Sequence, residues 1–332
     1  MPIDVCLTVD LEFDLGGALG RPEECHPAGA PSVMRMVQNK SEGLGFFLET
    51  LAQHGLPATF FVEVFQSCHF GTGEMTSVVE TIRRSGAHDF QLHTHPIWRE
   101  LAHKDWRSNT SNIQLNDSFL GLENLRPILA EAIELFRQIC GQPATTLRPG
   151  NLHVDMQVLR QAAELGLQGS SSVGLGYWMP KEAPLHIFNG TGHVGNLLEV
   201  PVATYHEIWP FSRKPKILTI TGSSWPTLEG YLRWASRKLS TPVVLLTHAS
   251  EFAEVVHRAP NGEITYRASS YNQAKLRRLC HYLASQPDKF RVTTFRKGLD
   301  QWKSMPAEQL PPYQAPLISA AARWFGNKYY RI

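Results

Sequence analysis

Short, almost uninterrupted apolar runs alternate with longer segments of helical periodicity along most of this chain. Examples of the runs are DVCLTV at 4–9, ATFFVEV at 58–64 and PVVLLTH at 242–248. A strand has this continuous apolar pattern when both of its faces are buried, as in a parallel sheet that helices cover. The alternation therefore predicts an α/β fold built from βα units, arranged as a barrel or as an open sheet.

Local signals place the other elements of this fold. Gly55 is suited to end a helix that begins near residue 42. The segment 96–116 is polar, aromatic and long, so we expect it to form a loop, and loops of this length often have a function. Further strands are expected at 89–94, 145–149, 216–221 and 290–295, and helices at 42–54, 74–85, 117–140, 153–165, 226–238 and 270–285.

The composition argues against several classes of protein. With 42% hydrophobic and 19% charged residues, the chain has the balance of an ordinary globular protein. A net charge of +2 and scattered basic residues leave no electrostatic footprint for nucleic acid, so we expect none as a partner. The five cysteines lack CxxC spacing, which favours a reducing compartment. Because the first residues also lack a signal-peptide pattern, we expect a cytoplasmic location.

Polar residues that close an apolar strand are the candidates for function, because parallel α/β proteins bind ligands at the carboxyl ends of their strands. At the first such end, Asp10, Glu12 and Asp14 alternate along the chain, so they share one face of an extended backbone. Three converging carboxylates repel one another unless a cation or solvent neutralises them. This stretch is therefore either a cation site or a solvated turn.

Three further strand ends carry polar residues. His93 and His95 share a strand face, and imidazoles with a carboxylate are a common zinc-binding set, although such a pair is also ordinary at a polar surface. Arg148 either forms a salt bridge at the rim or fixes a catalytic carboxylate. His248 is either a proton donor or a histidine hydrogen-bonded to backbone at the edge of the core. Taken together, the four strand ends favour metal-assisted hydrolysis.

These motifs resemble those of the polysaccharide deacetylase superfamily, also called the NodB-homology or carbohydrate esterase family 4 group. The resemblance covers most of residues 3–300 and implies an irregular (β/α)7-type barrel of mostly parallel strands, here within a domain at 1–304. It rests on LTVDLE at 7–12, HGLPATFFVEV at 54–64, SGAHDFQLHTHP at 85–96, LRPGN at 147–151, LGLQGSSSV at 165–173 and LLTHASEF at 245–252.

The resemblance implies catalytic roles for three residues in the hydrolysis of an N-acetyl or O-acetyl group on a sugar. Asp10 would be the catalytic base, Arg148 would pair with it, and His248 would be the general acid that protonates the leaving group. The family has an acid that tunes this histidine, and Ser170 stands at the aligned position. We therefore expect either a lowered activity or a different acid beside His248.

The resemblance also implies a divalent metal, with zinc as the first expectation. Its ligands would be Glu12, His93 and His95, and the metal would polarise the acetyl carbonyl and bind the attacking water. The family usually spaces its two histidines four residues apart, but the residue four after His93 is Ile97. Hence His95 is the expected third ligand, unless the site is altered.

The leading hypothesis is a metal-dependent deacetylase of a sugar or sugar-linked intermediate, for instance a nucleotide- or lipid-linked sugar in surface polysaccharide assembly. A hydrolase of a non-sugar amide and a catalytically degenerate barrel that acts as a binding protein are the alternatives. Residues 305–332 are expected to form a proline-rich connector and a C-terminal amphipathic helix. That helix would either dock on the body of the protein or make peripheral contact with a membrane.

Overall fold

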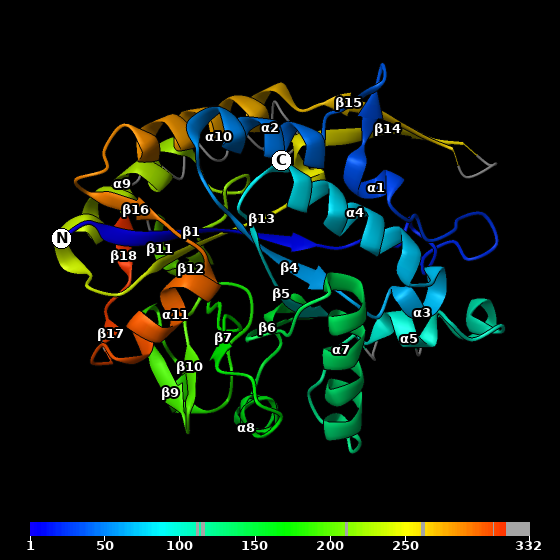
Figure 1. The fold of residues 1–332 in the computed structure, drawn as a ribbon, viewed down its shortest axis with the longest axis horizontal. Helices are drawn as coiled ribbons and strands as arrows, with labels where there is room; N and C mark the ends of the chain where they lie inside the picture. The colour runs from blue at the N-terminus through cyan, green and yellow to red at the C-terminus, as the bar shows by residue number, and fades with distance from the viewer. Residues whose placement is uncertain (111–112, 114–116, 210–211, 260–262, 308, 317–332) are drawn as a thin grey trace.

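A curved sheet of mostly parallel strands runs through the centre of the computed structural model (Figure 1). The structure describes residues 1–110, 113, 117–209, 212–259, 263–307 and 309–316. Within these ranges seven strands pair in parallel, in the order β13 (Val243–His248), β1 (Ile3–Leu11), β4 (Thr59–Glu63), β5 (Asp89–Thr94), β6 (Thr146–Pro149), β7 (Gly169–Ser170) and β10 (Leu197–Glu199). The predicted α/β class and the (β/α)7-type arrangement are confirmed.

The sheet curls until its two ends nearly meet. Beyond β10, Val202 forms a parallel bridge with Val244 in β13, and Thr219 forms a second one with Leu246. Two more strands extend the sheet: β9 (Gly192–Val194) runs antiparallel to β10, and β16 (Phe290–Val292) pairs with the start of β1. The barrel is irregular because isolated bridges, rather than a full ladder, close it.

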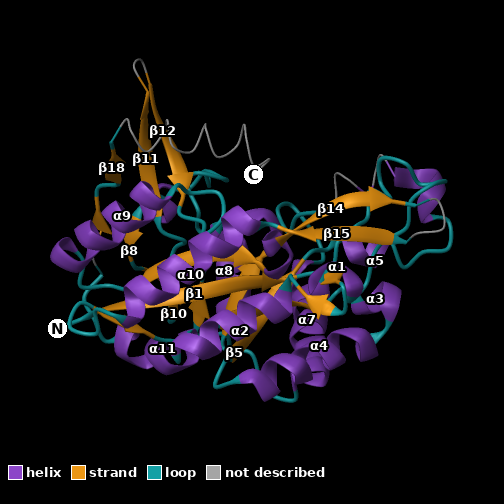
Figure 2. Ribbon diagram, turned by 90° about the horizontal axis from the view of Figure 1, so that it is seen from above, coloured by secondary structure: helices purple, strands orange, loops and turns teal. Residues whose placement is uncertain are grey.

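Helices surround the sheet (Figures 1 and 2). Gly55 and Gly141 end α2 and α7 in the left-handed conformation, at φ 63° and φ 62°, as expected of a glycine at a helix C-terminus. The longer helices are α2 (Leu44–His54), α4 (Thr72–Ser85), α7 (Leu125–Cys140), α8 (Met156–Glu164), α9 (Trp225–Lys238), α10 (Ser270–Ala284) and α11 (Phe295–Lys303). Shorter ones are α1 (Pro31–Met34), α3 (Ser67–Phe70), α5 (Ile97–Glu100) and the 3₁₀ turns η1 (Trp106–Asn109), η2 (Gly150–Leu152), η3 (Ala183–Leu185) and η4 (Ala249–Phe252).

The sequence predictions for residues 117–140 and 96–116 were wrong, and the strands expected at 216–221 and 290–295 end at Ile217 and Val292. The helix expected at 117–140 begins only at Leu125, because Gly121 has a φ of 73° and the side chain of Asp117 turns toward a histidine instead. The segment 96–116 contains α5 and η1 among its described residues rather than loop alone.

Four small sheets lie outside the main sheet among the described residues. The hairpin of β11 and β12 projects at one end of the molecule, and that of β14 and β15 lies toward the opposite end (Figure 2). The strands are β11 (Thr204–Trp209), β12 (Ser212–Ile217) and β18 (Tyr313–Ala315), β14 (Ala253–Arg258) and β15 (Ile264–Ala268), β8 (Asn189–Gly190) and β17 (Gln309–Leu310), and β2 (Met36–Val37) and β3 (Lys40–Ser41).

Part of the C-terminal region is attached to the body. β17 and β18, from the expected proline-rich connector, pair with β8 and β11. The helix expected near the end of the chain falls within 317–332, outside the described residues, so the domain boundary at residue 304 stays a prediction. None of the helices in the described ranges combines the length and the apolar character needed to cross a bilayer.

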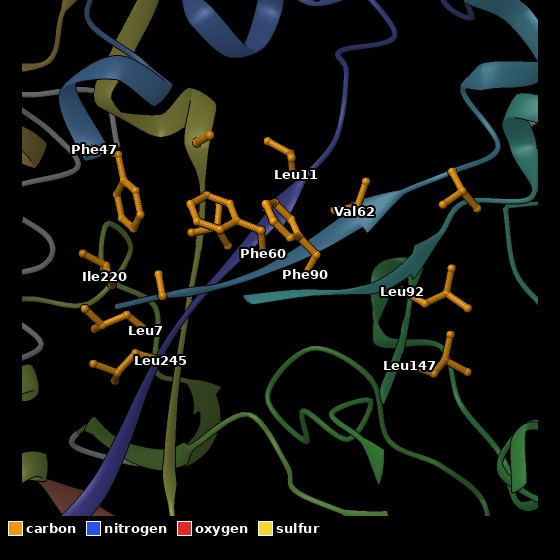
Figure 3. Close-up of a cluster of buried hydrophobic side chains, with 14 of the residues drawn as sticks. Leu7, Leu11, Phe47, Phe60, Val62, Phe90, Leu92, Leu147, Ile220 and Leu245 are labelled. Carbon is orange, nitrogen blue, oxygen red and sulfur yellow. The ribbon is translucent and has the colours of Figure 1, made fainter. Parts of the chain in front are cut away.

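Alternation along β1 separates the core from the site. Leu7, Phe60 and Phe90 belong to one buried cluster on the face that α2 covers through Phe47 (Figure 3). Cys6 belongs to a second, smaller cluster on the other face of the strands. Side chains at even positions of β1 share that face because the side-chain period of a strand is two. Asp10 is the last even-numbered residue of β1, so its side chain lies on this second face, where the candidate site is.

Candidate active site

All six residues predicted for the site come together at the carboxyl ends of β13, β1, β5 and β6. In the sheet register Asp10 lies opposite His248, and His93 lies opposite Arg148. Glu12 is the first residue after β1, and His95 is the first residue after β5. Their catalytic and metal-binding roles stay predictions, whereas their proximity is a feature of the fold.

Glu12, His93 and His95 have the geometry of a metal-ligand set. One ligand atom from each residue lies within 4.8 Å of the other two. A Glu12 oxygen is 2.8 Å from Nε2 of His95 and 3.5 Å from Nε2 of His93. Nδ1 of His93 lies 2.7 Å from the carbonyl oxygen of Arg148. A proton on Nδ1 would donate there and leave the Nε2 lone pair facing Glu12.

An orphaned atom supports this ligand set. Nε2 of His93 is buried and has no hydrogen-bond partner among the described residues, and such a buried polar atom calls for a partner. Two imidazoles and a carboxylate are a donor set that zinc accepts, with room for water or substrate in the fourth position. The three residues therefore fit the divalent metal that the sequence motifs imply.

His95 is held in place from three sides. Its Nδ1 lies 3.0 Å from both carboxylate oxygens of Asp117, and its backbone N–H donates to Glu63 at 3.0 Å. A Cβ on Gly150 would stand only 2.4 Å from the imidazole, so the ring packs directly against that glycine. These contacts aim Nε2 at Glu12 and explain how a histidine at the unusual spacing reaches the site.

Sequence reasoning missed both carboxylates that support His95. Glu63 is fully buried at the end of β4 and also accepts from the backbone N–H groups of Phe65 and Gln66. Burial raises the pKa of Glu63 to about 7, with His95 acting in the opposite direction. An acid inside the apolar run ATFFVEV was a usable signal for Glu63. Asp117, in a polar segment 22 residues beyond His95, gave none.

Replacing Asp117 with asparagine is expected to weaken Zn²⁺ binding about 10- to 100-fold, as for other residues that orient a metal ligand. The Asp117 carboxylate faces Nδ1 of His95 and accepts from the amide of Asn151 at 2.7 Å. An asparagine amide can present its one oxygen to only one of these groups. Isothermal titration with Zn²⁺ measures the change. Glu164→Gln, at an exposed ion pair with Arg126, is the control, and equal affinities of the two variants would contradict the assignment.

Asp10 is fixed by a fully buried arginine. Its carboxylate accepts from Arg148 at 2.6 Å. The guanidinium also donates to Thr8 Oγ1 at 3.1 Å and to the carbonyl and hydroxyl oxygens of Ser171 at 3.0 and 2.9 Å. It lies over the ring of Phe61, 3.9 Å from the centroid. These contacts leave Arg148 little freedom, so the Asp10 carboxylate is held in one orientation.

His248 is paired with Glu251, which sequence reasoning also missed. Nδ1 of His248 is 3.1 Å from Oε1 of Glu251. The other oxygen of Glu251 accepts from Thr221 and Thr247 at 2.7 and 2.6 Å and from the backbone N–H of His248 at 3.1 Å. Burial alone would lower the pKa of His248, but Glu251, together with the charges of Glu12 and Asp10, outweighs it and raises that pKa to about 10. His248 lowers the pKa of Glu251 to about 2 against the effect of burial.

Glu251 supplies the acid beside His248 that Ser170, at the aligned position, cannot provide. Ser170 is buried beside Glu199, a carboxylate that accepts from the backbone N–H groups of Ser172 and Val173 at 2.9 Å. The acid beside His248 is instead the residue three positions later, within HASEF. The sequence left two outcomes open, a lowered activity or a different acid beside His248. In the structure a different acid, Glu251, lies beside the histidine.

Asp14 does not join the ligand set, although it alternates with Asp10 and Glu12. Its carboxylate is 2.7 Å from Arg258 in β14. Cavities of about 290 and 420 Å³ adjoin the site, and Glu12, His95 and His248 line both. The smaller one has apolar walls from Leu152, Ile217 and Leu246. The arrangement thus brings a possible metal-ligand set, a fixed carboxylate and a carboxylate-paired imidazole to one small cavity.

Comparisons with known proteins agree with this fold. The family model described as Polysaccharide deacetylase matches residues 41–170. A Mycobacterium smegmatis structure provisionally assigned as a polysaccharide deacetylase is 18% identical, with a TM-score of 0.51 over 93% of this chain and 94% of that one. The allantoinase Puue is 12% identical, with a TM-score of 0.50 over 91% of each chain. At these identities the structural likeness shows the fold alone. No curated protein matches the sequence.

Proposed function

We propose that this chain, whose residues 41–170 match the polysaccharide deacetylase family model, is a metal-dependent hydrolase that removes an acetyl group from an N-acetylated or O-acetylated sugar. The observation that supports this best is the ligand set of Glu12, His93 and His95 beside two paired catalytic candidates. One of these is Asp10, held by Arg148, and the other is His248.

The side chains have distinct tasks in this proposal. Asp10 accepts a proton from the attacking water, and Arg148 keeps its carboxylate oriented toward the cavity. His248 donates a proton to the departing amine or alcohol, while Glu251 holds its ring through Nδ1 and leaves Nε2 directed at the site. A divalent metal, with zinc as the first expectation, would polarise the acetyl carbonyl and lower the pKa of the attacking water. The products are acetate and the free amine or hydroxyl of the sugar.

The substrate and location are part of the same proposal. We place the substrate among nucleotide- or lipid-linked sugar intermediates of surface polysaccharide assembly, in agreement with the cytoplasmic location expected from the sequence. The C-terminal tail is proposed to give peripheral contact with a membrane. Fractionation of cells that express the tagged protein tests the location, and recovery outside the cell would reject it.

Acetate release tests the activity. The purified protein is incubated with N-acetylated hexosamine oligomers and with O-acetylated sugars, before chelation, after chelation, and after reconstitution with Zn²⁺ or Co²⁺. We expect release that chelation abolishes and metal restores. Release that persists in metal-free protein would overturn the metal dependence. Amine or ammonia release from small amides alone would favour the non-sugar hydrolase, and metal-free purified protein without any turnover would favour a binding protein.

A further inference from the structure

The larger of the two cavities beside the site reaches an arginine that has no task in the proposed reaction. Arg35, the residue that follows α1, lines the cavity of about 420 Å³ together with Glu12, His95 and His248. It does not line the smaller, apolar cavity. A ligand that fills the larger cavity therefore meets both the proposed metal ligands and this guanidinium.

The guanidinium of Arg35 is fixed in place but has no acidic partner. Its Nε donates to the carbonyl of Ser32 at 3.0 Å, and its Nη1 donates to the carbonyl of Ala253. The group also lies over the ring of Tyr266, 5.5 Å from the centroid. Among the described residues no carboxylate forms an ion pair with Arg35, and its Nη2 has no acceptor. One nitrogen of a rigidly held cation is thus left to donate to a ligand.

The acids of the same cavity are all paired. Four carboxylates line it, and each lies within 3.1 Å of a histidine or an arginine. The pairs are Glu12 with His95, Asp117 with His95, Glu251 with His248, and Asp14 with Arg258. An anion that enters this cavity would therefore meet an unpaired guanidinium, whereas each carboxylate there already has a partner.

The backbone at Arg35 is strained. Its φ of 45° places it in the left-handed conformation at the C-terminal end of α1, where glycine is usual because it has no Cβ. Residues other than glycine that adopt such a conformation cluster at functional sites. A long cationic side chain is present here despite that strain, which agrees with a role for the guanidinium itself.

We propose that Arg35 forms an anion-binding subsite, which takes a phosphate or carboxylate group that the substrate carries beside its acetylated sugar. This inference rests on the proposed function and adds a charge requirement to it. A guanidinium donates charge-assisted hydrogen bonds to both kinds of group. A phosphate on the anomeric oxygen and the carboxylate of an acidic sugar share this chemistry, whereas a neutral acetylated sugar would leave Arg35 unpaired.

Binding measured apart from turnover tests the subsite. Metal-loaded protein is titrated by calorimetry with the neutral methyl glycoside of N-acetylglucosamine, its anomeric phosphate, its uridine diphosphate conjugate and the corresponding N-acetylated uronic acid. We expect at least one anionic ligand to bind about 10- to 100-fold more tightly than the neutral one, the range of one hydrogen bond to a charged group. Arg35→Met should remove this advantage and leave the affinity for the neutral ligand unchanged. In turnover it should raise KM for the anionic substrate alone, with kcat unchanged.

A loss confined to anionic ligands separates recognition from support of the fold, because a damaged site would bind all four ligands more weakly. Equal affinities of the wild type for neutral and anionic ligands would overturn the subsite without any variant, and so would binding of none of them. An advantage that persists in Arg35→Met would assign the anion to the metal and also overturn it. Loss for the two phosphate ligands identifies phosphate as the group recognised, and loss for the uronic acid identifies carboxylate.

Arg267→Met is the matched control. Arg267 is paired with Glu254 at 2.8 Å and lines a neighbouring cavity of about 520 Å³ but not the cavity of the subsite. Its loss should leave the preference for anionic ligands unchanged. An equal loss of that preference in Arg267→Met would reject the assignment to Arg35. Arg35→Lys keeps the charge and should recover part of the preference.

The subsite and the proposed activity can fail separately. Anion binding that depends on Arg35, without acetate release from any of the ligands, would support the subsite and reject the deacetylase. Metal-dependent acetate release at equal kcat/KM from neutral and anionic sugars, unchanged in Arg35→Met, would support the deacetylase and reject the subsite.

Discussion

Asparagine at position 10 is expected to lower acetate release about 10²- to 10⁴-fold, the usual contribution of a general base. An amide cannot accept the proton from water, yet its oxygen still accepts the hydrogen bond from Arg148. Arg148 also retains its bonds to Thr8 and Ser171. The Zn²⁺ affinity of Asp10→Asn should therefore equal that of the wild type, and steady-state kinetics with metal analysis measures both quantities.

Loss of the charge on Asp10 also affects folding, so a matched variant is needed. Removing one partner of a buried ion pair can cost about 3–5 kcal/mol, and the hydrogen bond retained in Asp10→Asn should keep the loss below that range. Asp4→Asn removes a buried carboxylate that pairs with Arg291 near the other end of β1, away from the cavity. Urea unfolding compares the stabilities. Full turnover in Asp10→Asn would remove this residue from the base role.

Glutamine at position 251 is expected to lower kcat about 10²-fold or more, the lower bound of a general-acid contribution, with KM nearly unchanged. Both carboxylate oxygens of Glu251 accept hydrogen bonds, one from Nδ1 of His248 and the other from Thr221, Thr247 and the backbone N–H of His248. An amide must turn its N–H₂ toward one of these groups. It then either faces the backbone N–H or forces His248 into the other tautomer.

The control for this variant lies three residues along the chain. Glu254 is paired with Arg267 and Ser269, at 2.8 and 3.1 Å, and does not contact His248. Glu254→Gln should keep its kcat, and the chemical shifts of the His248 ring in Glu251→Gln should report the changed tautomer. A kcat in Glu251→Gln equal to that of the wild type would mean that His248 acts without this carboxylate.

The site residues at the strand ends could be predicted from the sequence because each one closes a recognisable apolar run. Asp10, Arg148 and His248 each close an apolar run, and parallel strands present such residues at one edge of a sheet. The fold class followed from the same runs, since continuous apolar strands indicate that both faces of the sheet are buried.

Residues whose role depends on a tertiary contact could not be predicted from the sequence. Asp117 reaches His95 only because the chain remains non-helical until Leu125, and the sequence pattern favoured a helix there. Glu251 lies within a motif that was recognised, but its role depends on a 3₁₀ turn that brings position i+3 back to His248. Neither contact leaves a periodic signal in the sequence, so only the folded backbone reveals them.

The two walls of the cleft differ in how extensively their strands are hydrogen-bonded to their neighbours. Every proposed catalytic or metal-binding residue lies at the ends of β13, β1, β5 and β6, where ladders tie neighbouring strands together. The facing wall, with Tyr177 and Thr219, lies beyond β7, where pairing falls to two positions and then to the isolated bridge at Val202. Local opening is easiest where few backbone hydrogen bonds must break. A bulky substrate is thus expected to widen the cleft at this seam, while the spacing of the chemical groups stays constant.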